Sequence, residues 1–483
     1  MASFISHEMQ KLRKVKRARV SSGVAVVSIV ARPHPCPHGR CIYCPGGVDT
    51  PQSYVDRSPV VMRGRRLNYD PYLQVIDRLR NFVESGYKPS KVELIVMGGT
   101  FNAMPFEYQE WFIKRAFDAM NSFLENEEIR SEDLLEAHRI NELSKVRCVA
   151  LTLETRPDWA KEDHVDKMLY LGFTRVEVGV QSPYDDVLER IRRGHTVRDV
   201  IEATRILKDA GYKVGYHLMP GLPGSDLDRD LEALRTIFED PSFRPDMLKI
   251  YPTLVIEGTQ LYDMWKRGEY RALSEEDALE FLIKALQLIP RWVRLQHVQR
   301  DIPEQDIDAG PKRRNLRQLA EEFLWKRGIW IQEIRFREAG HVAHRGLKPD
   351  YSSVRLNKIE YEASGGTEFF LSIEDENDII MGLLRLRKPS VLAHRWEVDE
   401  KTAIVREIHV YGHQLPIGEK PVEEAQHRGF GRMLMAEAER IAAEELDANK
   451  IIVISGVGAR EYFRKLGYRR IKGSFYMGKE LAG

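Results

Sequence analysis

Six short runs of mostly β-branched and apolar residues recur through the first half of the chain. Their near-continuous apolar character is typical of parallel strands that are covered on both faces of a sheet. Amphipathic helical patterns lie between them, and two of these, 70–86 and 197–211, end in the glycine expected just after a helix. The expected strands are 24–30, 91–97, 146–154, 175–181, 213–219 and 247–251.

This alternation of strand and helix predicts the α/β class. Six consecutive βα units fit a partial (β/α)6 barrel, in which ligands bind to the loops at the carboxyl ends of the strands. An open, doubly wound parallel sheet is the alternative arrangement of the same elements. In both arrangements, candidate site residues follow the expected strands.

The second half of the chain has a different pattern. The strand–helix rhythm stops near residue 290, and the segment that follows mixes basic residues, proline and glycine with short amphipathic pieces. Short strand patterns and a long helical pattern then indicate a compact α+β domain. We therefore expect a basic arm at 1–20, a barrel domain at 21–310, a connector at 311–365 and an α+β domain at 366–483.

Three of the four cysteines lie within nine residues, directly after the first expected strand. Cys36, Cys41 and Cys44 have the spacing C-x4-C-x2-C. Three thiolates can hold three irons of a 4Fe-4S cluster, and the open fourth iron can chelate S-adenosylmethionine (SAM) and pass an electron into its sulfonium. The alternatives are a zinc site completed by His34 or His38, and a C-x-x-C redox pair.

Other candidate residues follow the second to fifth strands at the same expected edge. Gly98 and Gly99 would let the backbone approach a ligand and grip the amino group of SAM, although a tight βα connection explains them equally well. Cys148, inside a strand, is best explained as a small buried apolar residue. Candidate contacts to SAM or substrate are Glu154, Arg156, Gln181 and His217.

A glycine-rich loop marks the C-terminal domain. The pattern Q-x-x-G-x-G at 426–431 precedes a long helix, where backbone amides and the positive helix end can bind a pyrophosphate. The order of strand, loop, helix, strand and the sequence AREYFRKLGY is the layout of a GNAT-type acetyltransferase. Tyr462 could then reach the thioester of acetyl-CoA, and Glu407 and His409 are candidate acid–base groups. Packing roles for all three are the alternative.

Charge is distributed unevenly, although the net charge is only +1. The first forty residues contain eight basic residues and a single acidic one, Glu8, which suggests a phosphate-rich partner; a solvated arm is the simpler explanation. Because the first residues turn basic after a modest apolar patch and no apolar run approaches the roughly 20 residues of a membrane span, we expect a cytoplasmic protein without a membrane partner.

Taken together, the segments 32–47, 97–101, 426–442 and 454–468 closely resemble the catalytic subunit of Elongator, over nearly the whole chain. The resemblance implies a single-chain, prokaryotic-type member with a radical SAM barrel and a GNAT-type domain. It implies an enzyme that forms 5-carboxymethyluridine at the wobble uridine of tRNA. Phe463 departs from the pattern, because many relatives carry a second tyrosine there.

The resemblance also implies a reaction. A 5′-deoxyadenosyl radical takes hydrogen from the methyl group of acetyl-CoA, the carbon radical adds to carbon 5 of uracil, and hydrolysis of the thioester releases CoA. The implied partners are acetyl-CoA, the anticodon loop of tRNA and an electron donor, and a dimer or a larger assembly is compatible with the sequence. The rival functions are a protein lysine acetyltransferase and a tRNA-binding scaffold without activity.

The resemblance assigns residues to each ligand. Acetyl-CoA contacts are implied for Lys91, Glu407, Ile408, His409, Val410, Gln426, His427, Arg428, Gly429, Phe430, Gly431 and Tyr462. Contacts to the tRNA backbone are expected from the basic residues Lys11, Arg13, Lys14, Lys16, Arg17, Arg19, Arg63, Arg65, Arg66, Lys312, Arg313 and Arg314.

Overall fold

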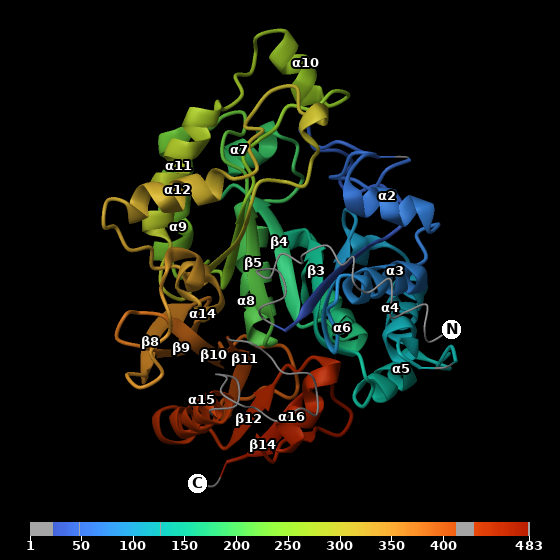
Figure 1. The fold of residues 1–483 in the computed structure, drawn as a ribbon, viewed down its shortest axis with the longest axis vertical. Helices are drawn as coiled ribbons and strands as arrows, with labels where there is room; N and C mark the ends of the chain where they lie inside the picture. Colours follow the sequence, from blue (N-terminus) through green and yellow to red (C-terminus); the bar gives the residue numbers. More distant parts are fainter. Residues whose placement is uncertain (1–22, 48, 126, 412–428, 482–483) are drawn as a thin grey trace.

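A computed structural model describes residues 23–47, 49–125, 127–411 and 429–481. The basic arm at 1–20 and residues Gln426, His427 and Arg428 lie outside the described residues. The chain forms two domains, with the C-terminal sheet below the barrel strands in the view of Figure 1. Within the described part of the chain, no helix is long and apolar enough to cross a membrane.

The N-terminal domain is built on a parallel sheet whose strands pair in chain order. Such an order is that of a partial barrel, because a doubly wound sheet reverses direction at its centre. All six expected strands are present, and a seventh, β7, follows them, so the count of six is corrected. The strands are β1 (Ala25–Val30), β2 (Lys91–Met97), β3 (Arg147–Thr155), β4 (Arg175–Gln181), β5 (Lys213–Leu218), β6 (Met247–Ile250) and β7 (Arg294–Val298).

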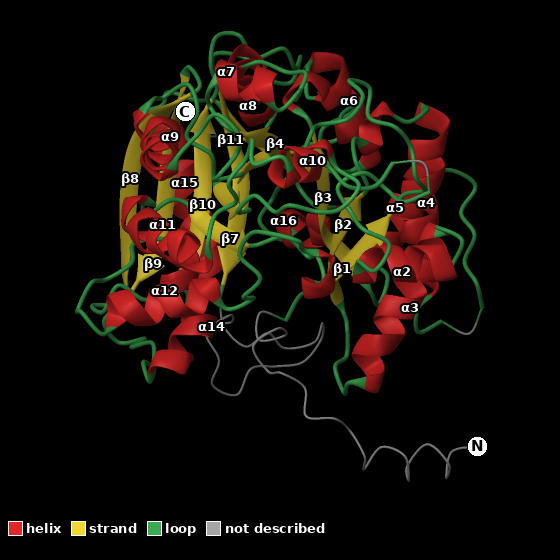
Figure 2. Cartoon of the chain, turned by 90° about the horizontal axis from the view of Figure 1, so that it is seen from above, coloured by secondary structure: helices red, strands yellow, loops and turns green. Residues whose placement is uncertain are grey.

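Helices cover the outer face of this curved sheet, and Figure 2 shows α2 to α5 outside β1, β2 and β3. Local sequence sets their ends: the side chain of Thr196 accepts a hydrogen bond from the backbone of Asp199 and caps α8. The helices are α2 (Pro59–Arg66), α3 (Pro71–Glu84), α4 (Phe106–Ser122), α5 (Leu134–Asn141), α6 (Glu162–Leu171), α7 (Asp185–Arg190), α8 (Val197–Asp209), α9 (Leu227–Glu239), α10 (Gln260–Lys266), α11 (Glu275–Leu288), α12 (Leu316–Trp325), α13 (Ile334–Arg337) and α14 (Ala339–Val342).

The C-terminal domain contains a second sheet, in the order β13-β14-β12-β11-β10-β9-β8. Its pairs are antiparallel except for β11 and β12. The edge strand β8 begins at Arg355, inside the range expected to be a connector. The elements are β8 (Arg355–Ala363), β9 (Gly366–Glu374), β10 (Ile380–Lys388), β11 (Thr402–Val410), α15 (Phe430–Arg440), β12 (Lys450–Val453), α16 (Arg460–Arg464), β13 (Arg469–Arg470) and β14 (Met477–Glu480).

Strand β11 has two irregularities that matter for the site. It pairs with β12 only from Thr402 to Val405, so the two strands are no longer paired beyond that point. On its other side, Glu407 lies opposite Arg385 and Val405 opposite Leu386, which leaves Arg406 without an opposing residue. Arg406 is therefore the extra residue of a β-bulge, a feature that redirects neighbouring side chains.

Buried ion pairs join the two domains. The guanidinium of Arg406 donates to both carboxylate oxygens of Asp246, at 2.8 and 2.7 Å, and to Glu368 at 2.7 Å. Arg387 donates to Asp209, the last residue of α8, at 2.7 Å. Asp246 directly precedes β6, so the second domain contacts the N-terminal ends of the barrel strands.

Candidate active sites

The cysteine loop follows the carboxyl end of β1. Two backbone hydrogen bonds fold it, from Gly39 to Cys36 at 3.0 Å and from Cys44 to Cys41 at 3.1 Å. Cys41 and Cys44 are buried, Cys36 is half-buried, and all three thiols are free. Burial and the neighbouring Cys41 raise the pKa of Cys44, so a positive centre is needed to hold all three sulfurs as thiolates.

Hydrogen-bond donors surround these sulfurs. Thr100 Oγ1 lies 3.5 Å from the Sγ of Cys36, and Arg193 Nη1 lies 3.6 Å from the Sγ of Cys41. Donors to sulfur tune and stabilise an iron–sulfur cluster, so the residues present fit a three-cysteine cluster. The Nε2 of His34 is already 3.0 Å from the carbonyl of Thr100, which does not favour His34 as a zinc ligand.

The glycine turn at the end of β2 faces this loop. Gly98 and Gly99 have φ angles of 120° and 60°, a region in which other residues are strained. A Cβ on Gly99 would lie 3.6 Å from the Sγ of Cys36. The turn therefore brings backbone close to the three cysteines; the contact with SAM stays a prediction.

The inside of the barrel is polar. Strand register places Thr152, Arg175 and Lys213 in one row across β3, β4 and β5. Glu154 and Glu177 lie side by side in the next row. Their chain neighbours belong to the apolar core beneath the helices, so these side chains point to the inner face. Barrels of this kind are usually filled with branched apolar residues, and this polar interior is a departure that indicates function.

An ion-pair network connects these inner side chains. Lys249 Nζ lies 2.9 Å from the carboxylate of Glu154 and also contacts Glu177, whose carboxylate lies 2.9 Å from His217 Nε2. Although burial opposes ionisation, Lys249 and Arg175 hold the pKa of Glu177 well below its usual range. The sequence predicts Glu154 and His217 as site residues but not Lys249 or Glu177, because charged residues inside strands resemble solvent-facing positions.

Glu154, Glu177 and His217 are close enough to share a metal ion. The ammonium of Lys249 already lies against both carboxylates, so a further cation there is disfavoured. The group is better explained as a charge-balanced support for a ligand bound at the carboxyl ends of the strands.

Two other predicted contacts have different environments. Arg156 is buried, pairs with Asp158 at 2.9 Å and donates to the carbonyl of Arg193 at 2.6 Å. It therefore supports Arg193 beside Cys41 and has little capacity left for SAM. Gln181 has φ 69°, and its buried Oε1 has no partner among the described residues, which leaves it available to a ligand.

The predicted acetyl-CoA loop ends at the start of α15. Gly429 adopts φ 83°, and Phe430 and Gly431 form the first turn of the helix. A Cβ on Gly431 would lie 2.6 Å from the hydroxyl oxygen of Tyr462 on α16. Burial raises the pKa of Tyr462 to about 12, so its phenol is a neutral donor above the first turn of the helix.

The candidate acid–base residues lie on the part of β11 beyond its pairing with β12, with Ile408 and Val410 packed against the apolar core of the domain. Glu407 is bonded to Lys213 of the barrel and, at 2.7 Å, to Arg385. Burial alone would raise the pKa of Glu407, but these two cations lower it to about 2. An acid–base role is therefore not favoured. Glu407 is a structural anion.

His409 remains a candidate. Burial lowers its pKa to about 4, so the imidazole is neutral near pH 7. Its buried Nε2 has no hydrogen-bond partner among the described residues, and its ring lies 4.4 Å from that of Tyr411.

Lys91 is the first residue of β2, as Lys213 is of β5. Burial and the nearby Arg147 lower the pKa of Lys91. Both lysines thus lie at the N-terminal ends of the barrel strands, whereas the cysteine loop lies at the carboxyl ends. From Lys213 to His217 the strand rises roughly 13 Å, at about 3.3 Å per residue.

The predicted RNA contacts are only partly exposed. Arg63 points inward, donates to the carbonyl of Ser28 at 2.5 Å and has its pKa lowered to about 10 by burial, so it does not face a phosphate. Arg65 pairs with Asp56 at 2.8 Å and Arg66 with Asp77 at 2.6 Å. Lys312 is half-buried, and Arg313 and Arg314 are exposed.

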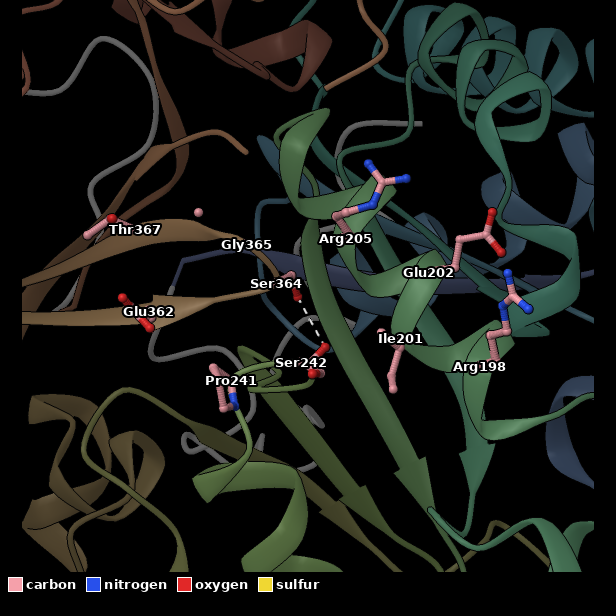
Figure 3. Close-up of a pocket in the computed structure, with 11 residues that line it drawn as sticks. Arg198, Ile201, Glu202, Arg205, Pro241, Ser242, Glu362, Ser364, Gly365 and Thr367 are labelled. Atoms are coloured by element: carbon pink, nitrogen blue, oxygen red, sulfur yellow. Dashed lines mark hydrogen bonds between the residues drawn. The ribbon is translucent and has the colours of Figure 1, made fainter. Parts of the chain in front are cut away.

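A cavity of about 550 Å³ lies between α8 and the turn from β8 to β9. Figure 3 shows Arg198, Glu202 and Arg205 along one side of α8, with Ser364 bonded to Ser242 opposite them. Its lining is of mixed charge and includes none of the predicted site residues. We assign no role in either site to this cavity.

Profile comparisons define the class of the protein. The Radical SAM superfamily profile matches residues 34–237, and the Radical_SAM C-terminal domain profile matches 245–326. The Acetyltransferase (GNAT) family profile matches 334–468. The chain is therefore a radical SAM protein with a GNAT acetyltransferase domain. Its cofactors are a 4Fe-4S cluster and SAM, and its GNAT domain takes acetyl-CoA.

Whole-chain relatives narrow this class to one family. The tRNA uridine(34) acetyltransferase of Methanocaldococcus jannaschii is 52% identical over 97% of this chain and 86% of its own length. Elongator complex protein 3 of Homo sapiens is 46% identical over 95% of this chain and 85% of its own. The solved structure of Methanocaldococcus infernus Elp3 with an N-terminal deletion has 48% identity and a TM-score of 0.84, covering 95% of this chain and all of that one. The chain belongs to the Elongator protein 3 family.

Proposed function

We propose that this protein modifies the wobble uridine of tRNA and forms 5-carboxymethyluridine from acetyl-CoA. The names of its relatives support uridine 34 as the target. One structural observation supports carboxymethyl chemistry in particular. Lys213 donates a hydrogen bond to Glu407 on β11, the strand proposed to contact acetyl-CoA. Lys213 is the first residue of β5, whose other end lies at the side of the barrel proposed to bind SAM. An acetyltransferase that used only the thioester carbonyl would not need this connection.

When bound, the cluster supplies the electron that cleaves SAM and yields a 5′-deoxyadenosyl radical able to take hydrogen from a methyl group. Cys36, Cys41 and Cys44 would hold the cluster, and the turn at Gly98 and Gly99 would approach SAM. The Lys249 network would fix Glu154 and His217 at the same edge. A water-poor, charge-balanced interior would protect a reactive carbon centre from side reactions.

At the other end of the barrel, the GNAT domain would hold CoA, and the acetyl group would have to reach the SAM side for hydrogen to be taken from its methyl; hydrolysis of the thioester would follow in the GNAT domain. The amides at the start of α15 would bind the CoA pyrophosphate. The neutral phenol of Tyr462 would donate a hydrogen bond to the thioester, and the neutral His409 would accept a proton from the water that releases CoA. Glu407 would keep β11 in place rather than exchange protons.

The test is anaerobic reconstitution with iron and sulfide, followed by SAM, acetyl-CoA, a reductant as electron donor, and tRNA, with nucleosides analysed by mass spectrometry. We expect 5-carboxymethyluridine together with 5′-deoxyadenosine, and neither product in Cys41→Ala. Cys148→Ala is the matched control, because this buried cysteine lies outside the loop.

The alternative function, protein lysine acetylation, predicts a different result. Acetyl transfer to protein lysine would then continue in Cys41→Ala, and tRNA nucleosides would stay unchanged in every sample. A preparation in which SAM is cleaved but no uridine is altered would refute the uridine assignment.

A further inference from the structure

A second basic region lies on the GNAT domain, away from the cysteine loop. Five of the nine residues from Arg464 to Lys472 are lysine or arginine, and none is acidic. This segment borders a cavity of about 690 Å³. The side chains of Trp396, Lys450, Arg469, Arg470 and Lys479 contribute to its lining.

Among the described residues, Arg469 and Arg470 have no ion-pair partner, whereas the neighbouring cations do. Lys479 pairs with Glu439 at 2.8 Å. Arg460 and Arg464 share the carboxylate of Glu142, at 2.8 and 2.5 Å, and Arg464 also pairs with Glu461. Arg470 donates to the carbonyl of Ser474 at 3.1 Å, and burial together with the charge of Arg460 lowers its pKa. An anion bound in the cavity would relieve this repulsion between like charges.

The acidic residues near the cavity do not neutralise it. Glu397 is buried and bonded to Arg395 at 2.7 Å and to Ser474 at 2.6 Å. The carboxylate of Asp399 lies 3.2 Å from Lys450, at the rim. Arg469, Arg470 and Glu480 are exposed, and among the described residues only Lys450 and Lys479 of the four lining cations have an ion-pair partner.

An exposed aromatic side chain lies beside these cations. Trp396 is 63% exposed, which leaves a large apolar ring in contact with water. Aromatic rings next to a basic groove are the means by which proteins bind single-stranded nucleic acid: bases stack on the ring while cations neutralise the backbone. The cavity is large enough for a nucleotide of such a strand.

We propose that this cavity binds an unpaired stretch of RNA, with a base stacked on Trp396 and phosphates at Arg469 and Arg470. The proposal rests on the proposed function, which gives the protein an RNA substrate, and adds a contact outside the wobble nucleotide. An acidic peptide would satisfy the charges but would not use the flat face of the indole.

The test uses the full chain without SAM or acetyl-CoA and measures the fluorescence anisotropy of a short labelled single-stranded RNA. Trp396→Ala should weaken binding by about five- to hundredfold, since stacking contributes about 1–3 kcal/mol per base. Trp396→Phe should keep most of the affinity. Trp111→Ala, at another exposed tryptophan on α4, is the matched control and should bind as the wild type does.

Charge is tested separately. Arg469→Ser combined with Arg470→Ser should lower the slope of log affinity against log salt by about 1.4 for a single strand, and ultraviolet crosslinking should join RNA to the peptide that contains Trp396. Wild-type RNA affinity in both variants would refute the proposal, as would binding of an acidic peptide in place of RNA. Because no modification is measured, this outcome is independent of whether uridine is carboxymethylated.

Discussion

The stability of this protein depends on several single buried charges. Lys249 is the clearest case, because its buried ammonium balances two carboxylates inside the barrel. Burying an ion pair gives little net stability, but removing one partner leaves an uncompensated charge in a medium of low polarity. The pair therefore adds little to the stability of the wild type, whereas a variant without one of the partners loses much stability.

The substitution Lys249→Met should lower the free energy of unfolding by about 3–5 kcal/mol, because Glu154 and Glu177 then lack their cation. Urea unfolding measures this. Lys284→Met is the control: its pair with Glu280 is exposed, and its loss should change stability by less than about 1 kcal/mol. Equal effects of the two substitutions would contradict the internal network.

Glu407 should give the protein an acid-sensitive component of stability. Its pKa in the folded state is about 2, below the usual carboxyl value, so its contribution is full above about pH 4.5 and is lost as the pH falls toward 2. The loss is about 3.5 kcal/mol, for about 2.5 pKa units at about 1.4 kcal/mol each. When urea unfolding is measured from pH 6 to 2, the free energy of unfolding should fall less with decreasing pH in Glu407→Gln than in the wild type. An unchanged slope would contradict its pairing with Lys213 and Arg385.

At the scale of single residues, a sequence pattern predicts the role of a residue when few other roles explain the same pattern. Three clustered cysteines and a paired glycine turn have few explanations, and the structure brings Cys36 and Gly99 together. Lys249 and Lys213 could not be predicted, because a lysine in a strand is most often solvated. Their partners, Glu177 and Glu407, come from other strands, and Glu407 from the sheet of the other domain, so only the tertiary structure brings these charges together.

Strands with continuous apolar runs could be predicted from the sequence, whereas strands with many polar residues could not. The continuous runs of β1 to β6 indicate buried parallel strands, and the sequential order follows from short right-handed connections. Strand β7, RLQHV, is half polar because part of it faces the barrel interior, and the edge strand β8 has one exposed side. Neither has the apolar run that identifies a strand, and only tertiary pairing reveals them.

Two glycines test how elements pack. A Cβ on Gly456 would lie 2.0 Å from the backbone oxygen of Val149 on β3, which cannot move without breaking the sheet. Gly456→Ala should therefore lower the free energy of unfolding by more than about 2 kcal/mol, measured by urea unfolding.

In Gly431→Ala the close atom is the hydroxyl of Tyr462, which can rotate away. We expect less than about 1 kcal/mol there but weaker CoA binding by calorimetry. A larger stability loss at Gly431 would reverse this reasoning.

At the scale of the whole molecule, buried charges join the two domains, and we expect the chain to unfold as one cooperative unit. Arg406 and Arg387 of the GNAT domain have their partners Asp246 and Asp209 in the barrel. The alternation of elements predicts the two domains separately, but nothing in either half indicates this interface, because each charge is unremarkable until the other half is present.

Isolated residues 334–483, which include the whole GNAT profile, should therefore fail to fold stably. Removal of the barrel leaves Arg406 and Arg387 without those carboxylates and exposes apolar surface. Circular dichroism and calorimetry provide the measurement: we expect no cooperative transition for this segment and a single transition for the full chain. A cooperative transition in the isolated segment would show that the interface is dispensable.

The bulge at Arg406 makes the length of β11 more important than its composition. One extra residue allows Arg406 and its neighbour Glu407 both to reach the barrel. Deleting Arg406 itself would close the bulge and remove its ion pairs while Glu407 stays opposite Arg385, but the loss or gain of a residue between Glu407 and His409 would shift the register against β10 and turn the side chains that follow to the opposite face. Most substitutions here remove one interaction, whereas an insertion or deletion of a single codon beyond the bulge would misdirect the whole end of β11 that we propose to contact acetyl-CoA. Natural variation in this strand should consist of replacements, with changes in length confined to its flanking loops.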